Sequence, residues 1–171
     1  VLFHFQAEVL SLLMLLFHNL EEEDSIVDGL TIANSNSDSG GGVDCLLSSP
    51  TLRRCVITGT ASSPNPSSAA LRCFASSPTL TNCVIADNQT FGISTVPLGN
   101  PTLTHCTLCN NLAGGIFNAG KPVLTNCILW GDTQPEISVL SGSAVATYSN
   151  IQGGWPGAGN LSIDPKFAFP G

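Results

Sequence analysis

The segment His105-Cys106-Thr107-Leu108-Cys109 combines two thiols, three positions apart, with an adjacent imidazole. These residue types bind zinc or carry out thiol redox chemistry. On a β-strand, however, positions i and i+3 point to opposite faces, and no second pair of ligands occurs at a comparable spacing. The pattern therefore disfavours a metal or redox site, and we expect neither a metal nor another cofactor.

Acid–base chemistry has four further candidates, namely Asp44, Arg72, Asp87 and Asp132. Asp44 and Arg72 immediately precede two cysteines that align in the repeats described below. The simplest interpretation is a cross-repeat ion pair that contributes a few tenths of a kcal/mol. Asp87 and Asp132 are predicted at corresponding turns two repeats apart, about 10 Å from each other. This separation is too long for a shared metal ion, although inverting glycosidases hold their two carboxyls roughly 6.5–9.5 Å apart. No nucleophile motif accompanies these residues, so none of them is assigned a catalytic role.

The elements that must position these residues come from an internal repeat. Four segments align without gaps: SSPTLRRCVI at 48–57, SSPTLTNCVI at 76–85, GNPTLTHCTL at 99–108 and GKPVLTNCIL at 120–129. The steps between their cysteines are 28, 23 and 21 residues, and a repeat of this length indicates a solenoid. Each unit contains short β-type runs separated by Gly, Ser, Pro and Asn, so three strands and three turns fit one coil of a parallel β-helix.

The aligned positions predict columns of identical side chains that face the interior. One column contains Leu52, Leu80, Leu103 and Leu124, the next contains Cys55, Cys83, Cys106 and Cys127, and a third contains Ile57, Ile85, Leu108 and Leu129. A further column is predicted for Cys45, Cys73, Val96 and Phe117, each five residues before the proline of its repeat. Before each core cysteine stand Arg54, Asn82, His105 and Asn126, and we expect the amides of Asn82 and Asn126 to belong to a hydrogen-bonded ladder at a corner.

The seven cysteines allow a disulfide framework, but the columns favour reduced thiols. Side chains in register on parallel strands point the same way, which suits stacked small apolar groups better than the near-perpendicular torsion of a disulfide.

The predicted fold class is therefore all-β: a single-stranded right-handed parallel β-helix of about six to seven coils, with an N-terminal cap and a loop-rich C-terminal cap. Residues 1–24 are predicted as a cap or first coil, 25–151 as the repeats, and 152–171 as a capping loop that folds Trp155, Phe167 and Phe169 over the last coil. The apolar run at 9–17 has the length of a secretory signal core, but Glu8 precedes it and an acidic run follows at 21–24, so a cap is favoured.

The motifs PTLTNCVI at 78–85, NCILW at 126–130 and YSNIQGG at 148–154, together with IDPKF at 163–167, resemble bacterial right-handed β-helix repeat proteins of pectate-lyase-like architecture. These proteins are secreted or lie on the cell surface. The resemblance implies an extracellular, non-catalytic domain that binds polysaccharide or surface proteins or acts as a spacer. It implies as the alternative a polysaccharide lyase or glycoside hydrolase, or a fragment of one. Only that alternative would require Ca²⁺ held by aspartates with an arginine base, for which the four acid–base candidates are the available residues.

Composition limits the partners. Charged residues are 10% of the chain, the net charge is −7, and only five residues are basic. A nucleic-acid binder needs a basic face, so this class is excluded, and an anionic membrane surface is disfavoured for the same reason. No run of apolar residues is long enough to predict a membrane span. The Thr-x-Thr pairs at 79–81 and 102–104 resemble the ranks of ice-binding proteins, but Arg53 and Val123 interrupt these ranks, which favours ordinary β-sheet threonines.

Overall fold

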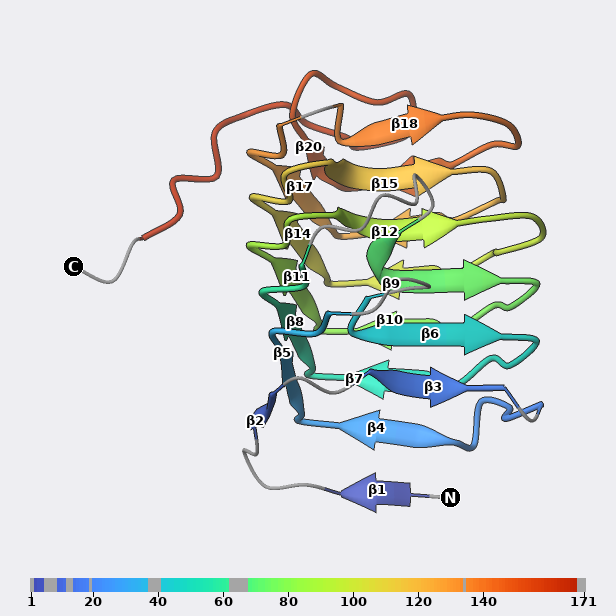
Figure 1. Cartoon of the computed structure of the whole chain (residues 1–171). Helices are drawn as coiled ribbons and strands as arrows, with labels where there is room; N and C mark the ends of the chain where they lie inside the picture. Colours follow the sequence, from blue (N-terminus) through green and yellow to red (C-terminus); the bar gives the residue numbers. More distant parts are fainter. Residues whose placement is uncertain are drawn as a thin grey trace.

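A computed structural model describes residues 2–4, 9–11, 14–18, 20–36, 41–61, 68–133 and 135–168, the first two ranges by their backbone only. It contains three sheets in which every pairing is parallel and each strand pairs with the strand three elements away in the chain (Figure 1). The described residues form strands, turns and loops, with no helix. The predicted all-β parallel solenoid is therefore confirmed.

The chain visits the three sheets in a fixed order, and one visit to each makes a coil. Sheet A contains seven strands: β1 (Leu2–His4), β4 (Ile26–Asp28), β7 (Thr51–Arg53), β10 (Thr79–Thr81), β13 (Thr102–Thr104), β16 (Val123–Thr125) and β19 (Val145–Thr147). Sheet B contains seven: β2 (Val9–Ser11), β5 (Thr31–Ala33), β8 (Val56–Thr58), β11 (Val84–Ala86), β14 (Thr107–Cys109), β17 (Ile128–Trp130) and β20 (Asn150–Ile151). Sheet C contains six: β3 (Leu15–Phe17), β6 (Val43–Leu46), β9 (Ala69–Phe74), β12 (Phe91–Thr95), β15 (Gly114–Asn118) and β18 (Ile137–Val139).

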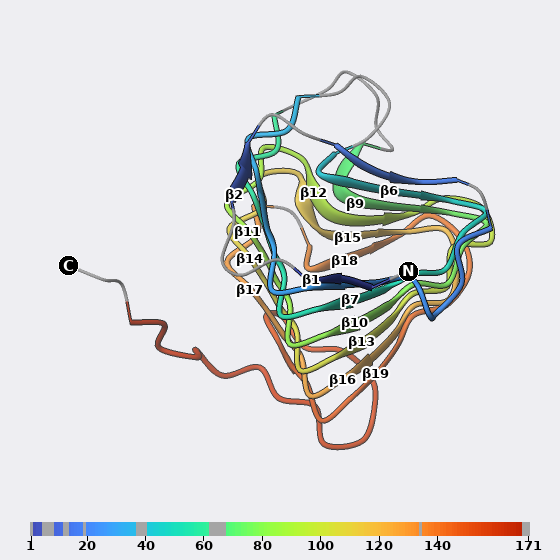
Figure 2. The same cartoon turned by 90° about the horizontal axis from the view of Figure 1, so that it is seen from below.

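The three sheets form the three sides of the cross-section and enclose a narrow core (Figure 2). On sheet A, Leu52, Leu80, Leu103 and Leu124 lie side by side in register, each 0% exposed. On sheet B, the same holds for Ile57, Ile85, Leu108 and Leu129. The four cysteines of the second column lie between these sheets, at most 1% exposed. They follow a residue with positive φ, so they sit at the corner and not inside a strand.

The column predicted on sheet C is wrong beyond its first two members. Cys73 pairs with Thr95, and Thr95 pairs with Asn118, so Val96 and Phe117 are each one position out of register. The cause is the connection from sheet C to the proline turn, which changes in length from coil to coil, so that counting back from the proline fails. Thr95 and Asn118 are both 0% exposed, and the Thr95 hydroxyl donates to Asn118 Oδ1 at 2.8 Å.

Phe117 instead lies on the outer side of sheet C. Its ring packs against Phe91, with the centroids 5.2 Å apart. Val96 also leaves the strand, and it remains 9% exposed next to the corner.

The two ends differ from each other. The described parts of residues 1–24 continue the three sheets as β1, β2 and β3, whereas Leu12 and Leu13 of the apolar run lie outside the described residues. At the other end, Trp155 packs against the core and its Nε1 donates to the carbonyl oxygen of Ala144 at 3.4 Å.

The chain then leaves the body of the solenoid (Figure 1). Asn150 holds the departing chain through two hydrogen bonds to the backbone of Ile163, at 2.6 and 3.0 Å, which direct it along the edge of sheet B. Phe167, in this segment, is 37% exposed, and its packing over the last coil stays a prediction. Phe169 lies outside the described residues.

The leucine column gives a direct test of the core. Replacing Leu103 with alanine should lower the free energy of unfolding by about 2–5 kcal/mol, because the cavity lies between two fully buried leucines and three-residue strands have few other contacts. Urea unfolding followed by circular dichroism measures the change. The matched control is Leu112→Ala, at a 59% exposed position, which should change stability by no more than about 0.5 kcal/mol. Equal losses in the two variants would contradict the dry core.

Candidate functional site

The corner between sheets A and B places one residue of each coil in the left-handed region. Gly29, with φ 74°, is that residue in the coil of β4, and the residues of the later coils are Arg54, Asn82, His105, Asn126 and Tyr148, with φ between 51° and 55°. The turn is needed because the chain must bend sharply between a three-residue strand of sheet A and the buried residue that precedes sheet B. Asparagine tolerates this conformation, whereas other L-residues pay roughly 1–2 kcal/mol. Arginine, histidine and tyrosine at this corner therefore carry a cost that their side chains must offset.

Four of these corner residues, all except Gly29 and Arg54, directly follow an outward-facing threonine of sheet A. In four successive coils the pairs are Thr81–Asn82, Thr104–His105, Thr125–Asn126 and Thr147–Tyr148, which we call the polar ladder. Backbone hydrogen bonds of 3.1–3.2 Å join neighbouring rungs from the corner nitrogen to the next threonine carbonyl. Parallel strands lie about 4.8 Å apart, so the ladder repeats its hydroxyl and its planar side chain at that interval.

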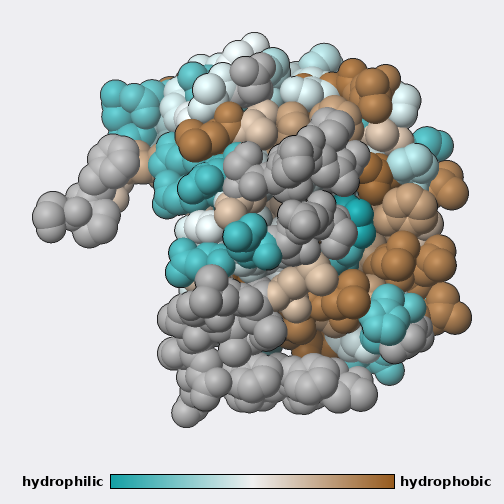
Figure 3. Space-filling view, in the orientation of Figure 1, coloured by the Kyte–Doolittle hydropathy of each residue, from teal (hydrophilic) through white to brown (hydrophobic). Residues whose placement is uncertain are grey.

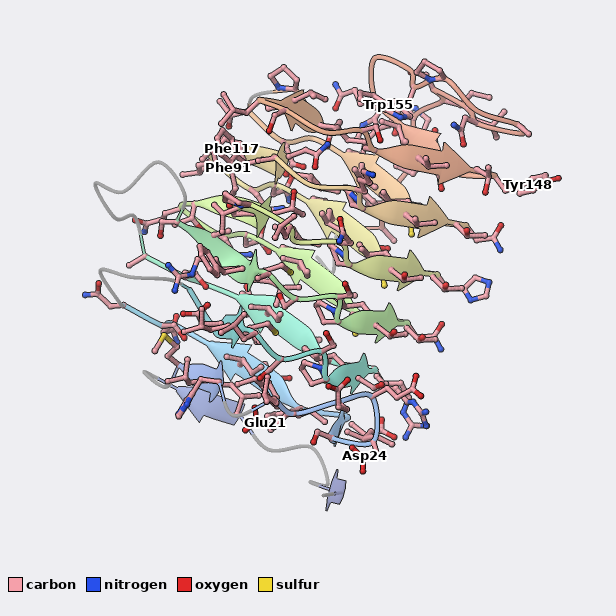
Figure 4. The ribbon with its side chains drawn as sticks, turned by 90° about the vertical axis from the view of Figure 1, so that its right-hand side faces the viewer. Glu21, Asp24, Phe91, Phe117, Tyr148 and Trp155 are labelled. Atoms are coloured by element: carbon pink, nitrogen blue, oxygen red, sulfur yellow. The ribbon has the colours of Figure 1, made fainter. Side chains whose placement is uncertain are left out.

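The side chains of the polar ladder are accessible. Asn82, His105 and Asn126 are exposed, and Tyr148 is 65% exposed and projects farthest from the body (Figure 4). His105 Nε2 and Asn126 Nδ2 lie 3.2 Å apart, within hydrogen-bonding distance. The rung below carries charge instead, because Arg54 makes a bidentate ion pair with Asp28 at 2.7–2.8 Å and Arg53 is exposed beside it.

The column predicted as an amide ladder contains the one contact between Asn126 and His105, and a buried ladder of amides lies at a different corner. Asn82 and Asn126 face solvent, whereas the buried amides are Asn88 and Asn111, both 0% exposed, at the turn from sheet B to sheet C. Asn88 Nδ2 donates to Asn111 Oδ1 at 2.8 Å, and the same Asn88 accepts from the backbone nitrogen of Thr60. A signal was present in the sequence: Thr60, Asn88, Asn111 and Asp132 each stand five residues after a core cysteine.

Asp44 and Arg72 are neighbours on sheet C, as expected from the repeat. Their ion pair is bidentate, with Arg72 Nε 2.9 Å from Asp44 Oδ1. The Asp44 side chain is only 4% exposed and that of Arg72 is 19% exposed. A substrate would have to displace this pair to reach either group, so the geometry fits a structural role.

Asp87 and Asp132 do not occupy equivalent turns, which corrects the predicted correspondence. Asp87 is the exposed residue with positive φ at the corner, and the equivalent residue two coils on is Gly131. Asp132 lies one position later, where it continues the buried amide ladder and accepts a hydrogen bond from the backbone nitrogen of Asn111. The two carboxyls therefore face different environments, so they do not form the predicted pair.

The partner of Asp132 is Glu136, which the sequence interpretation overlooked. Glu136 is 4% exposed, and Asp132 Oδ2 and Glu136 Oε2 are both buried with no hydrogen-bond donor among the described residues. Burial, together with the hydrogen bond to and the charge of Asp132, raises the pKa of Glu136 to about 9, and burial also raises the pKa of Asp132. One proton shared between the two carboxyls would satisfy both buried oxygens, which makes the pair a structural acid dyad in which Glu136 is buried and Asp132 is half-buried.

All seven cysteines are free thiols. Cys106 faces the core while Cys109 lies on the outer side of β14, so the Cys-x-x-Cys segment does not converge. Thiol–thiol hydrogen bonds along the column, together with burial, raise the pKa values of Cys83 and Cys106 to about 12. Burial, with the charges of Asp87, Asp132 and Glu136, raises that of Cys109 to about 11. Neutral thiols of this kind are poor nucleophiles and poor metal ligands.

Within the described ranges, no group of three or more His, Cys, Asp or Glu side chains is arranged to hold a metal ion. The same ranges contain no helix that is long and apolar enough to cross a membrane.

Comparison with known families decides the classification of the coils. A family model for the right-handed β-helix region matches residues 19–152. The chain belongs to the right-handed β-helix family. No curated protein matches the chain. Because β-helix domains occur in enzymes and in non-catalytic proteins, the function of this β-helix has to be argued from its own surface.

The acid dyad predicts how stability depends on pH. The folded pKa of Glu136, about 9, lies above its ordinary value of 4.5, so the protonated dyad contributes stability that is complete below about pH 4.5 and is lost as the pH rises toward 9. Glu136→Gln keeps a hydrogen-bond donor and cannot ionise. At about pH 9 the free energy of unfolding of this variant should therefore exceed that of the wild type by at least about 1 kcal/mol, and the difference should shrink toward pH 5.

Urea unfolding between about pH 5 and pH 9 measures this effect. Cys109 is another titratable group near the dyad, since the charges of Asp132 and Glu136 both act on it. Asp87→Asn is the control, because Asp87 is exposed, and it should leave the pH profile of the wild type unchanged. A Glu136→Gln profile parallel to that of the wild type would contradict the dyad.

Proposed function

We propose that this β-helix is a non-catalytic binding domain, secreted or held at a cell surface, and that it holds an uncharged glycan along the polar ladder. The observation that carries the proposal is the retention of His105 and Tyr148 at corners where glycine or asparagine would be less strained. Residues in unfavourable backbone conformations concentrate at functional sites, because selection for the side chain offsets the strain.

The chemistry of the ladder suits a carbohydrate. Hydroxyls, amides and an imidazole donate and accept hydrogen bonds, as sugar hydroxyls require, and the exposed ring of Tyr148 offers an apolar face with a polar tip. The rungs repeat about every 4.8 Å along the solenoid axis, so an extended polymer lying parallel to the axis would meet equivalent groups repeatedly. Several weak contacts of this kind add up through multivalency.

Charge favours a neutral ligand over a polyuronide. The net charge is −7, and Arg54, Arg72 and Lys166 are each held in an ion pair with an aspartate. The four upper rungs of the ladder carry no carboxylate and no arginine or lysine. A polyanionic chain on this face would meet long-range repulsion and few compensating cations.

Polysaccharide cleavage is the competing function, and the described carboxylates do not support it. Among the candidate carboxylates, Asp44 is held in a buried ion pair and Asp132 shares a dyad with Glu136, which leaves Asp87 as the exposed one. General acid–base catalysis requires a group within hydrogen-bond reach of the substrate.

The test removes side chains while relieving strain. The double variant His105→Gly/Tyr148→Gly should keep or raise the unfolding temperature, because glycine adopts positive φ readily. It should also bind neutral glycans at least about tenfold more weakly, a loss of about 1.4 kcal/mol. Affinity electrophoresis in gels containing glucan, xylan, mannan or polygalacturonate measures the change, and release of reducing or unsaturated ends is followed in parallel.

Asn34→Gly provides the matched control, since Asn34 has φ 57° and is exposed at the corner between sheets B and C, away from the polar ladder. This variant should bind as the wild type does. Preference of the wild type for polygalacturonate, cleavage of any glycan, or equal binding by the double variant would each overturn the proposal.

A further inference from the structure

A second line of strained residues follows the corner between sheets C and A, and it is apolar. Four successive passages through this corner contain Leu20, Leu47, Ala75 and Leu98, with φ values of 60°, 52°, 45° and 66°. The three leucines are 69%, 53% and 73% exposed. Each therefore combines a backbone conformation that is unfavourable for a bulky side chain with an apolar side chain left in water.

Neighbouring side chains extend this line into a patch. Leu46 and Phe74 are paired in register at the ends of β6 and β9, and Phe74 is 39% exposed. Apolar atoms gather along the right-hand side of the molecule where β6, β9 and β12 end (Figure 3). We call Leu20, Leu47, Phe74 and Leu98 the leucine ridge.

Neither the strained backbone of the leucine ridge nor the exposure of its apolar side chains stabilises the fold. The side chains point away from the core, so they contribute little to burial, and glycine or asparagine would relieve the strain of each corner. Monomeric proteins rarely expose large contiguous apolar patches, and such patches mark interaction sites. The combination indicates an interface.

An acidic turn at 21–24 adjoins the lower end of the ridge, directly after Leu20 (Figure 4). Two hydrogen bonds join it to the coil that carries Leu47: the Ser48 hydroxyl donates to Glu21 Oε2 at 2.8 Å, and the Ser49 backbone nitrogen donates to the Glu21 carbonyl at 2.6 Å. Glu22, Glu23 and Asp24 remain exposed. The surface thus presents apolar side chains with a fixed negative charge at one end.

We propose that the leucine ridge docks a basic amphipathic helix of a partner protein. The coils repeat about every 4.8 Å and a helix repeats about every 5.4 Å, so a helix lying along the ridge can set roughly one apolar side chain against each coil. Lysine or arginine near one end of that helix would meet the acidic turn. A second copy of this chain would bring its own acidic turn and net charge of −7, and an anionic membrane would be repelled by both, so charge favours a cationic protein segment.

This surface is independent of the polar ladder. The ridge lies at the corner between sheets C and A, whereas the ladder lies at the corner between sheets A and B. The domain could then hold a glycan and a protein at once, and failure of either proposal leaves the other standing.

The experiment uses two fluorescent amphipathic peptides of about 18 residues that share one leucine face and carry either lysine or glutamate on the other. Fluorescence anisotropy should detect binding of the lysine peptide at low salt. High salt should weaken that binding at least about tenfold, and at low salt the glutamate peptide should bind at least about tenfold more weakly than the lysine peptide. Leu47→Asn/Leu98→Asn should weaken binding of the lysine peptide about tenfold or more while keeping or raising the unfolding temperature, because asparagine tolerates the left-handed region.

Leu112→Asn is the matched control, a 59% exposed leucine outside the ridge, and it should bind as the wild type does. The double variant Glu22→Gln/Glu23→Gln should weaken binding of the lysine peptide and leave binding of the glutamate peptide no weaker than in the wild type. Equal binding of both peptides, an unchanged affinity in the ridge variant, or binding to anionic lipid vesicles in place of the lysine peptide would each overturn the proposal.

Discussion

Every feature of this molecule depends on backbone hydrogen bonds between equivalent positions of successive coils. Most strands are three residues long and would not persist alone. Each is held because the N–H and C=O groups on both sides find partners in the coils above and below, and because the same register places leucine upon leucine in the core. A residue type that fits one coil therefore tends to fit the next, and side chains accumulate in columns. The columns provide both the stability and the surface chemistry.

The register explains why part of the fold could be predicted. Between the repeat proline and the second residue after the cysteine, the spacing is constant in four copies, so the leucine, cysteine and aliphatic columns were fixed by counting alone. The connection from sheet C to the proline varies in length, and counting through it placed Val96 and Phe117 in positions that Thr95 and Asn118 occupy. Columns are thus predictable only within segments that contain no insertion.

The candidate sites were harder to predict for a different reason. Asp132 and Asp87 are both aspartates near a turn, but Asp132 is the fifth residue after its core cysteine and Asp87 only the fourth, so the two positions are not equivalent. Glu136 carries no sequence signal, since its raised pKa comes from burial beside Asp132. Positive φ at Leu47 and Leu98 could not be inferred either, because leucine is among the residues least expected there.

The three corners of the solenoid provide an internal comparison for the two proposed surfaces. All three require left-handed residues, yet the corner between sheets B and C fills its described positions with residues that tolerate this conformation: Asn34, Gly59, Asp87, Asn110 and Gly131. That corner also contains the buried amide ladder, so its residues serve the fold. The corner between sheets A and B also contains Gly29, Asn82 and Asn126, but it and the corner between sheets C and A include histidine, tyrosine and leucine side chains that are exposed to solvent. The three corners thus meet the same backbone requirement with different side chains: glycine, asparagine and aspartate between sheets B and C, and sets that include exposed histidine, tyrosine or leucine at the other two. Contacts with other molecules supply a reason for that difference, which the geometry of the corners alone does not.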